Sequence, residues 1–324
     1  MTSLHVLAVI PGTESDKGFV FARRQLRHLR ELGATVTLFP LETRTSLRGL
    51  IRAAAGFRSL IRDLRPDVVH AHYGSATGLF CALLSPVPVV VTFRGTDLNP
   101  SSEFSGVRAL VSRWMSQATA LFAREIICVS SELRQRLWWR RRRVELICSG
   151  VSLQEFHPTN RDEARAQLGW LSADRIVLFS YGVWYRPNKR RELVEEACRL
   201  ANARIPLRLV VLEDVLAADV PRYINAADVV VMASEFEGSP NIVKEALACN
   251  VPVCSVAVGD VPEMLADVDA SLIVEPTPSA IADGLVRILA RAPLRSDGRR
   301  FSSRFDADIL TRRVLEVLQR AALP

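Results

Sequence analysis

The stretch EFEGSPNIVKEALACNVPV, residues 235–253, predicts the passage from a strand into a helix that defines an α/β fold. The apolar run DVVVMAS before it, residues 228–234, is typical of a strand inside a parallel sheet. Ser239 and Pro240 are residue types preferred at the N-cap and first position of a helix, and Asn250 followed by Pro252 is a stop signal. We therefore expect a helix over about 240–249, beginning just beyond the carboxyl end of a strand.

The start of this predicted helix is suited to binding a ligand. In open α/β sheets ligands lie beyond the carboxyl ends of the strands, and the first turn of a helix offers free N–H groups and a positive dipole end. Glu237 precedes the helix, and Glu245 lies in its second turn, where side chains lean back toward the N-terminus. Because a carboxylate can accept hydrogen bonds from two sugar hydroxyls, the pattern predicts a site for an anion or a polar sugar. The alternative is that both acids only complement the helix dipole.

Short runs of Val, Ile and Leu alternate with amphipathic segments along the whole chain of 324 residues. This alternation predicts parallel sheets covered on both faces, in two doubly wound Rossmann-like α/β domains that face each other across a cleft. We place the domains at residues 1–150 and 151–304, and expect the amphipathic segment 305–324 to be a helix that returns to the N-terminal domain. The expected strands lie near 4–10, 35–39, 67–72, 87–93, 125–130, 144–148, 175–180, 207–212, 228–233, 252–258 and 271–275.

The block EFEGSPNIVKEALACNVPVCSVAVGDVPEML, residues 235–265, closely resembles the E-x7-E region of retaining glycosyltransferases of family 4, which have the GT-B fold. Other stretches resemble the same family in the same order along nearly the whole chain: PDVVHAHYG, VVVTFRGTDL, SGVSLQEFHP and PRYINAADVVVMAS. The resemblance implies transfer of a sugar from a nucleoside diphosphate sugar to a hydroxyl acceptor, without an obligatory metal or other cofactor.

The resemblance also assigns roles in donor binding. Glu245 would hold the nucleotide ribose and Glu237 the transferred sugar. Lys189 and Arg186 would neutralise the diphosphate that leaves, and Arg190 would assist them. The alternative for this basic segment is an ordinary solvated helix start with ion pairs along one face.

Further donor contacts are expected from the start of the helix, at Ser239, Asn241 and Ile242. The loop PGTESDKG, residues 11–18, would bring Gly18 close to the donor phosphates or the acceptor, since glycine allows close backbone approach. This loop lacks the GxGxxG spacing of a dinucleotide site.

The acceptor side is expected in the N-terminal domain. His72 follows a predicted strand and could hydrogen-bond in the cleft, whereas His70 is expected to be structural. Many members of the resembled family have a histidine where this chain has Arg94, so we expect Arg94 to meet an anionic group of the donor or acceptor. Asp97 is expected to bind acceptor hydroxyls.

The resulting prediction is a metal-independent, retaining hexosyltransferase acting on a glycan, a lipid-linked intermediate or a small-molecule glycoside. A catalytically silent GT-B partner or scaffold protein, and a nucleotide-sugar epimerase or hydrolase of the same fold, are the alternatives. The segment between LRLVVLE and PRYINAAD is shorter than in most of the resembled family, so the base of the donor is not predicted. No metal ligands are expected, because the DVD and DAD triplets lie outside the context of a metal-binding loop.

Charge and cysteine content bear on partners and location. Residues 1–150 hold 21 Lys and Arg against 11 Asp and Glu, so this half of the chain faces something anionic. The amphipathic segment 44–65 and the run LWWRRRR, residues 137–143, are candidate contacts with an anionic membrane, or else core packing and a solvated basic edge. No nucleic-acid-binding motif accompanies the charge. Six scattered cysteines and the lack of a spanning segment predict a cytoplasmic protein, peripheral to the inner face of the membrane if it binds lipid.

Overall fold

The computed structural model describes residues 3–13, 19–44, 46–99, 106–139, 144–182, 187–291 and 294–323. The chain divides into two compact units: unit 1 comprises residues 1–150 and 307–324, and unit 2 comprises residues 151–306. Gly18 and Arg186, both predicted to bind the donor, lie outside the described residues, as does the arginine run 140–143.

Unit 1 contains a six-stranded parallel sheet in the order β2-β1-β3-β4-β5-β6. The first and third strands are neighbours, so the strand order reverses between them, as in doubly wound folds. The strands are β1 (His5–Pro11), β2 (Thr35–Leu41), β3 (Val68–His72), β4 (Val89–Phe93), β5 (Glu125–Cys128) and β6 (Val144–Leu146). The helices are α1 (Val20–Glu31), α2 (Leu47–Leu64), α3 (Ala76–Leu84), α4 (Val107–Phe122), α5 (Ser131–Arg136) and α12 (Ala307–Ala322).

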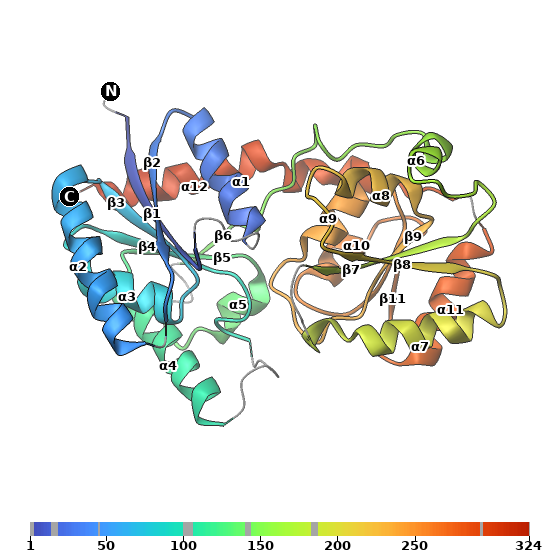
Figure 1. Ribbon diagram of the computed structural model, residues 1–324, viewed down its shortest axis with the longest axis horizontal. Coiled ribbons are helices and arrows are strands. Elements are labelled where there is room, and N and C mark those ends of the chain that lie inside the picture. The colour runs from blue at the N-terminus through green and yellow to red at the C-terminus, as the bar shows by residue number, and fades with distance from the viewer. Residues whose placement is uncertain are drawn as a thin grey trace. The chain divides into compact units, whose positions relative to one another are not determined.

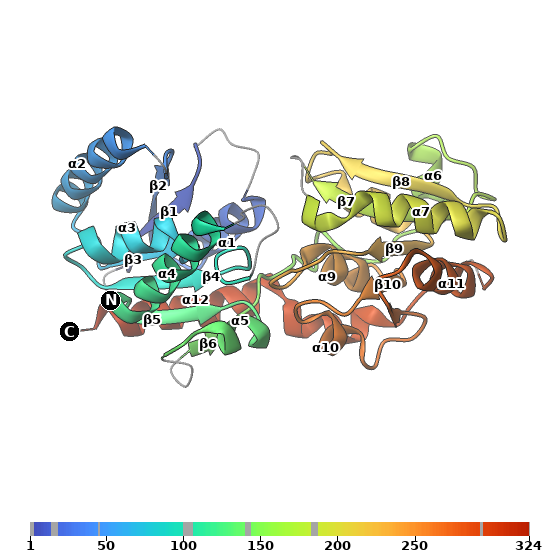
Figure 2. The ribbon, with the colours of Figure 1, turned by 90° about the horizontal axis from the view of Figure 1, so that it is seen from below.

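Helices cover both faces of this sheet (Figures 1 and 2). On one face, α1 and α12 bury a cluster that includes Leu26, Val314 and Leu318 against Val6 of β1. The carboxyl-terminal helix therefore completes unit 1, although the chain has passed through unit 2 before reaching it. On the other face, α2, α3 and α4 surround a second cluster.

The apolar face of α2 belongs to that second cluster. Phe57 is fully buried, and its ring centroid lies 5.4 Å from that of Phe39 and 5.2 Å from that of Phe80. Ile61 is 5% exposed in the same cluster. Of the two interpretations of segment 44–65, packing against the sheet is the one observed for Phe57 and Ile61, and a membrane contact of this segment stays a prediction.

Unit 2 contains a five-stranded parallel sheet in the order β11-β10-β9-β7-β8, so its strand order reverses between β7 and β9. Helices α7 and α11 cover one face, and α8 and α9 cover the other (Figure 1). The strands are β7 (Ile176–Gly182), β8 (Arg208–Glu213), β9 (Val229–Met232), β10 (Val253–Val256) and β11 (Leu272–Val274). The helices are α6 (Arg161–Gln167), α7 (Arg191–Asn202), α8 (Val220–Ala226), α9 (Asn241–Ala248), α10 (Val261–Leu265) and α11 (Pro278–Leu289), with 3-10 turns η2 (Pro187–Lys189) and η3 (Gly298–Phe305). The two predicted doubly wound Rossmann-like domains are confirmed.

Candidate active site

The loops that follow β7 and β9 lie side by side at the point where the strand order of unit 2 reverses. The backbone N–H of Glu235, after β9, donates to the carbonyl oxygen of Asn188, after β7, at 2.8 Å. Asn188 is 6% exposed, so this bond is inside the unit. Ligands of doubly wound folds bind beyond the carboxyl ends of the strands at such a reversal, which makes these two loops the candidate site.

Lys189 and Glu237 meet at this point. The Lys189 Nζ lies 2.5 Å from Glu237 Oε1, and the hydroxyl of Ser234 donates to the same oxygen at 2.9 Å. The side chains are 14% and 18% exposed, so the ion pair is shielded while still reaching the surface. The sequence predicted both residues separately, one for phosphate and one for sugar, and the structure brings them into direct contact. Arg190 follows with a φ of 52° and begins α7 as its N-cap.

Helix α9 starts directly after the Glu237 loop and carries the second predicted carboxylate. Its N-cap is Pro240 and its first residue Asn241, so the prediction of Ser239 as the N-cap is wrong. Asn250, with a φ of 56°, follows the C-cap, as the stop signal predicted. Ile242 and Glu245 are each 8% exposed. The side-chain oxygen Oδ1 of Asn241 is buried and has no hydrogen-bond partner among the described residues.

Ser239 is instead the centre of a buried network. The Nζ of Lys244, whose side chain is fully buried, donates to Ser239 Oγ at 3.1 Å, and Ser239 Oγ donates to Asp260 Oδ2 at 2.7 Å. Through these bonds, Lys244 of α9 and Asp260, the N-cap of α10, both hold Ser239, which lies between Glu237 and Glu245 in the sequence. Burial raises the pKa of Asp260 to about 6, an effect that the nearby Lys244 ammonium and the Ser239 hydrogen bond partly offset.

The sequence did not predict Asp260 as part of the site, although a signal was present. Asp260 comes just after β10, at the same edge of the sheet as Glu237, and Gly259 precedes it. Gly259 has a φ of 57°, and a Cβ there would lie 2.8 Å from the carbonyl oxygen of Gly238. A side chain at position 259 would push the two loops apart, so this glycine permits the network.

Unit 1 groups the predicted acceptor-side residues in an internal network. The Arg94 guanidinium donates from its terminal nitrogens to Ser149 Oγ at 2.8 Å and Gln25 Oε1 at 3.0 Å, and lies 2.8 Å from the Nδ1 of His72. It also lies 4.6 Å over the ring of Phe21. Arg94 therefore joins β3 and the loop after β4 to α1, and the contact expected for it with an anionic ligand group stays a prediction.

His70 and His72 stack in the interior of unit 1, with ring centroids 4.3 Å apart. Both are fully buried, and His70 Nε2 lies 2.8 Å from Thr92 Oγ1. Burial, reinforced by the Arg94 charge, lowers the pKa of His70 to about 3. Burial also lowers the pKa of His72 well below its ordinary value, with His70 and Arg94 adding to the effect. His70 is structural, as predicted. The ring of His72 has no exposed surface here, and its contact with the acceptor stays a prediction.

Asp97 holds the backbone around this network. Its Oδ1 accepts from the N–H of Gly95 at 2.8 Å, and its Oδ2 accepts from the N–H of Gly74 at 2.9 Å. The N–H of Arg94 reaches both oxygens at 3.1 Å. Burial raises the pKa of Asp97, and these backbone hydrogen bonds oppose the rise. With 3% of its surface exposed, Asp97 positions two loops, and its contact with acceptor hydroxyls stays a prediction.

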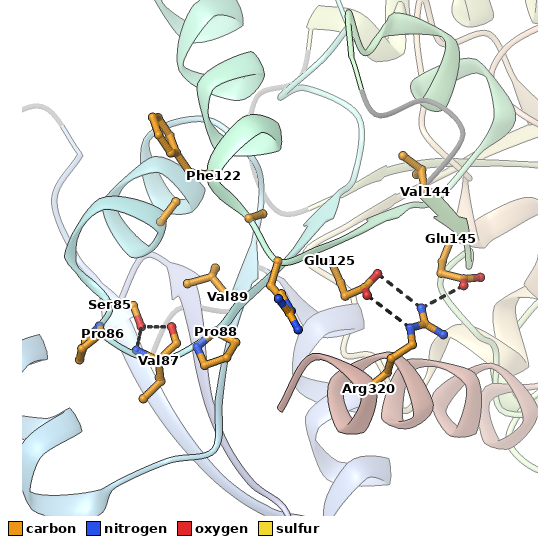
Figure 3. Close-up of a pocket in the computed structure, with 13 residues that line it drawn as sticks. Ser85, Pro86, Val87, Pro88, Val89, Phe122, Glu125, Val144, Glu145 and Arg320 are labelled. Carbon is orange, nitrogen blue, oxygen red and sulfur yellow. Dashed lines mark hydrogen bonds and ion pairs between the residues drawn. The ribbon is translucent and has the colours of Figure 1, made fainter. Parts of the chain in front are cut away.

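A cavity of about 900 Å³ lies elsewhere in unit 1. Figure 3 shows Val89, Glu125 and Val144 along it, and these residues begin β4, β5 and β6. It therefore opens at the amino ends of the strands, the opposite edge from Asp97 and Arg94. Arg320 of α12 bridges Glu125 and Glu145 across it, at 3.4 Å and 3.0 Å. Within the described parts of the chain, no three His, Cys, Asp or Glu side chains are grouped as metal ligands.

These features define a class of protein: two Rossmann-like domains of the GT-B type, with basic and acidic side chains at the strand reversal of the second. Residues 8–155 match the profile of the family described as Glycosyltransferase Family 4, and residues 173–291 match that described as Glycosyl transferases group 1. The chain belongs to glycosyltransferase family 4.

Relatives and solved structures agree with this assignment. TuaC of Bacillus subtilis strain 168, named as a teichuronic acid biosynthesis glycosyltransferase, is 27% identical over 251 residues, which are 70% of this chain and 62% of that protein. This chain thus spans less than two thirds of that relative's length. Sucrose-phosphate synthase from Thermosynechococcus elongatus has the same fold, with a TM-score of 0.79, 18% identity and 98% of both chains covered. Anabaena HepE, solved in complex with UDP-glucose, has a TM-score of 0.75 and 16% identity, with 98% of this chain and 100% of that chain covered.

Proposed function

We propose that the protein is a retaining glycosyltransferase that moves a hexose from a nucleoside diphosphate sugar to a hydroxyl acceptor without a metal ion. The observation that carries this is the shielded ion pair of Lys189 and Glu237 at the strand reversal of unit 2, directly before α9. An ammonium group has three N–H donors, and among the described residues one is used on Glu237. The others can meet phosphate oxygens without Lys189 leaving its partner.

The reaction breaks the bond between the anomeric carbon and the diphosphate oxygen and forms a bond from the same carbon to the acceptor oxygen on the same face. The leaving phosphate takes the proton of the acceptor hydroxyl, so no protein nucleophile is needed. Negative charge grows on the diphosphate as the bond breaks, and Lys189 with Arg190 would stabilise it. Glu237 would hold the sugar hydroxyls and Glu245 the ribose. Arg186, in the same loop, would add a further positive charge.

A donor and a location can also be proposed, from the solved structure of HepE and from the cysteines of this chain. HepE has been solved with UDP-glucose, so we propose a uridine diphosphate sugar as the first donor to test. The acceptor would be a glycan, a lipid-linked intermediate or a small-molecule glycoside. The six free cysteines, five of them buried, suit a reducing compartment, and we propose a cytoplasmic location.

A thermal-shift panel tests donor binding. UDP-, GDP-, ADP- and dTDP-sugars and the free diphosphates are added to the wild type, Glu245→Gln and Glu196→Gln, all in chelator. A ligand at about 100 times its Kd should stabilise the protein by about 2.7 kcal/mol. We expect one base to shift the wild type and Glu196→Gln, whose carboxylate is exposed on α7 and bound to Arg199, but not Glu245→Gln. A lack of response to every nucleotide would contradict the proposal.

Product analysis separates the alternatives. Transfer with retention of the anomeric configuration, undiminished in chelator, is expected once an acceptor is supplied. Donor binding without any turnover across acceptors would support a silent partner protein. Modification or release of the sugar without an acceptor would support an epimerase or hydrolase.

A further inference from the structure

Helix α4 carries exposed apolar side chains on the face turned away from the sheet, which we call its stripe. Its exposed apolar positions recur at three- and four-residue intervals from 107 to 114 and again at 121 and 122, two turns further on, and this spacing places them on one side of the helix. The opposite side, with Ser116 and Ala120, is fully buried in unit 1. The stripe consists of Val107 (77% exposed), Leu110 (56%), Val111 (50%), Trp114 (54%), Leu121 (53%) and Phe122 (58%).

Arginines border this stripe on both sides. Helical geometry places Arg108 about 100° from Val107 in one direction and Arg113 about 120° away in the other, and both side chains are exposed. The Arg113 guanidinium lies 5.6 Å over the ring of Trp138, and that ring packs edge-on against Trp114 with centroids 4.5 Å apart. Between residues 107 and 139 the sequence has five arginines and two glutamates. The surface is therefore apolar along its centre and cationic at its borders.

We propose that the exposed face of α4, together with Trp138 and Trp139, docks on the surface of an anionic lipid bilayer. Apolar and aromatic side chains enter the boundary between head groups and acyl chains, while flanking arginines meet the lipid phosphates. Tryptophan is favoured there because one end of its ring system is apolar and the other polar. Trp139, 36% exposed, already donates its Nε1–H to the carbonyl oxygen of Gln117, so its polar end costs little to bury.

Other occupants of this surface fit less well. Two copies of the chain meeting through α4 would bring their arginine borders together, and like charges across an interface oppose association. Insertion across the bilayer does not fit either, because no helix among the described parts is long and apolar enough to span one. A helix lying in the plane of the surface satisfies both the stripe and its charged borders. Docking of this kind does not depend on the transfer reaction.

Vesicle flotation of the whole protein tests the proposal, with phosphatidylcholine vesicles alone or mixed with phosphatidylglycerol. Two variants alter the surface: Val111→Ser with Trp114→Ser removes apolar area, and Arg108→Gln with Arg113→Gln removes charge. Matched controls on α2 are Ile51→Ser, which removes a side chain 62% exposed, and Arg58→Gln with Arg62→Gln. Circular dichroism and a thermal melt establish that each variant is folded.

We expect the wild type and both α2 controls to float with the anionic vesicles and to remain at the bottom with phosphatidylcholine. Each α4 variant should lower the partition into anionic vesicles about tenfold or more, since two arginines near such a surface each contribute substantially to binding. Equal binding to both lipid types, or equal losses on α2 and α4, would overturn the proposal. It would also be overturned if the wild type did not float, or if the α4 variants changed only the oligomeric state in size-exclusion chromatography.

Discussion

The Lys189 Nζ and the Glu237 Oε1 lie 2.5 Å apart, so the cation and the carboxylate at the candidate site form a direct ion pair. Each side chain fixes the other: the ammonium is 14% exposed and bound to Glu237, and the carboxylate is held by Lys189 and by the Ser234 hydroxyl. A preorganised charge of this kind stabilises a developing negative charge without having to reorganise during the reaction.

Replacing Lys189 should therefore impair turnover. We expect Lys189→Ala to lower kcat by about 10²- to 10³-fold, the effect of losing one preorganised charge-stabilising donor. The comparison is Arg191→Ala, two residues along, whose half-exposed ion pairs with Glu195 and Glu213 face the surface. Steady-state transfer assays should show less than about a threefold change for that variant.

Lys189→Ala, Glu237→Gln and the variant that carries both substitutions form a double-mutant cycle. Because the two side chains act together, the double variant should lose less activity than the product of the single losses. Independent, multiplicative losses would contradict a shared role, and an unchanged kcat in Lys189→Ala would remove it from catalysis.

Two glycines in unit 1 should respond to alanine in opposite directions. At Gly74, a Cβ would lie 1.8 Å from Cε1 of Phe93, whose side chain is fully buried. Gly74→Ala should therefore lower the free energy of unfolding by about 1–3 kcal/mol. At Gly56, in the middle of α2, a Cβ would meet nothing within 4 Å, so Gly56→Ala should stabilise by about 0.5–1 kcal/mol. Chemical denaturation at pH 7 measures both, and equal shifts would contradict the close packing of Gly74.

Loss of the Asp97 carboxylate should be costly for a different reason. Asp97→Ala leaves the N–H groups of Gly74, Arg94 and Gly95 without their acceptor inside the protein, which should lower the free energy of unfolding by about 2–4 kcal/mol. Asp63→Ala is the matched control, because that carboxylate is exposed and accepts from Ser59 on the same helix. Similar losses in urea denaturation for both variants would show that the backbone bonds of Asp97 contribute little.

The architecture was accessible from the sequence because both sheets are buried on two faces. Buried parallel strands have to be nearly continuous runs of Val, Ile and Leu, and each expected run, such as 228–233, overlaps an observed strand, here Val229–Met232. Glu237 and Glu245 could be proposed because their spacing on a strand, loop and helix is a local property of the chain.

Contacts between loops were not accessible in the same way. Lys189 and Glu237 are 48 residues apart, and their contact depends on the backbone bond between Glu235 and Asn188. Burial of His72 was missed because alternation places His70 and His72 on the same face of β3 but does not say how deeply that face is covered. The exposed stripe of α4 was missed because buried Ala and Thr residues on its other side blur the amphipathic pattern, whereas α2 has a clear pattern and packs on the core.

Asp260 should make stability depend on pH in a way opposite to an ion-paired carboxylate. Burial raises its pKa from 3.8 to about 6 in the folded protein. Between about pH 4 and 6 the folded state therefore keeps a proton that the unfolded state has lost, and the contribution of Asp260 to the free energy of unfolding falls as pH rises. At about 1.4 kcal/mol per pKa unit, the fall is about 3 kcal/mol at most and is complete above about pH 6.5.

The Asp260→Asn variant isolates this effect. Asparagine can still accept from Ser239 but does not ionise, so the wild type should lose stability relative to the variant between pH 4 and 6.5, after which the difference should be constant. Urea denaturation of both proteins at half-unit steps from pH 4 to 8 measures it, and subtraction removes the titration of all other groups. The charges facing Asp260 are the Lys244 ammonium and the Glu263 carboxylate, with opposite effects on its pKa. A difference that stayed constant from pH 4, or that changed in favour of the wild type as pH rose, would mean that Lys244 outweighs burial and keeps Asp260 ionised throughout.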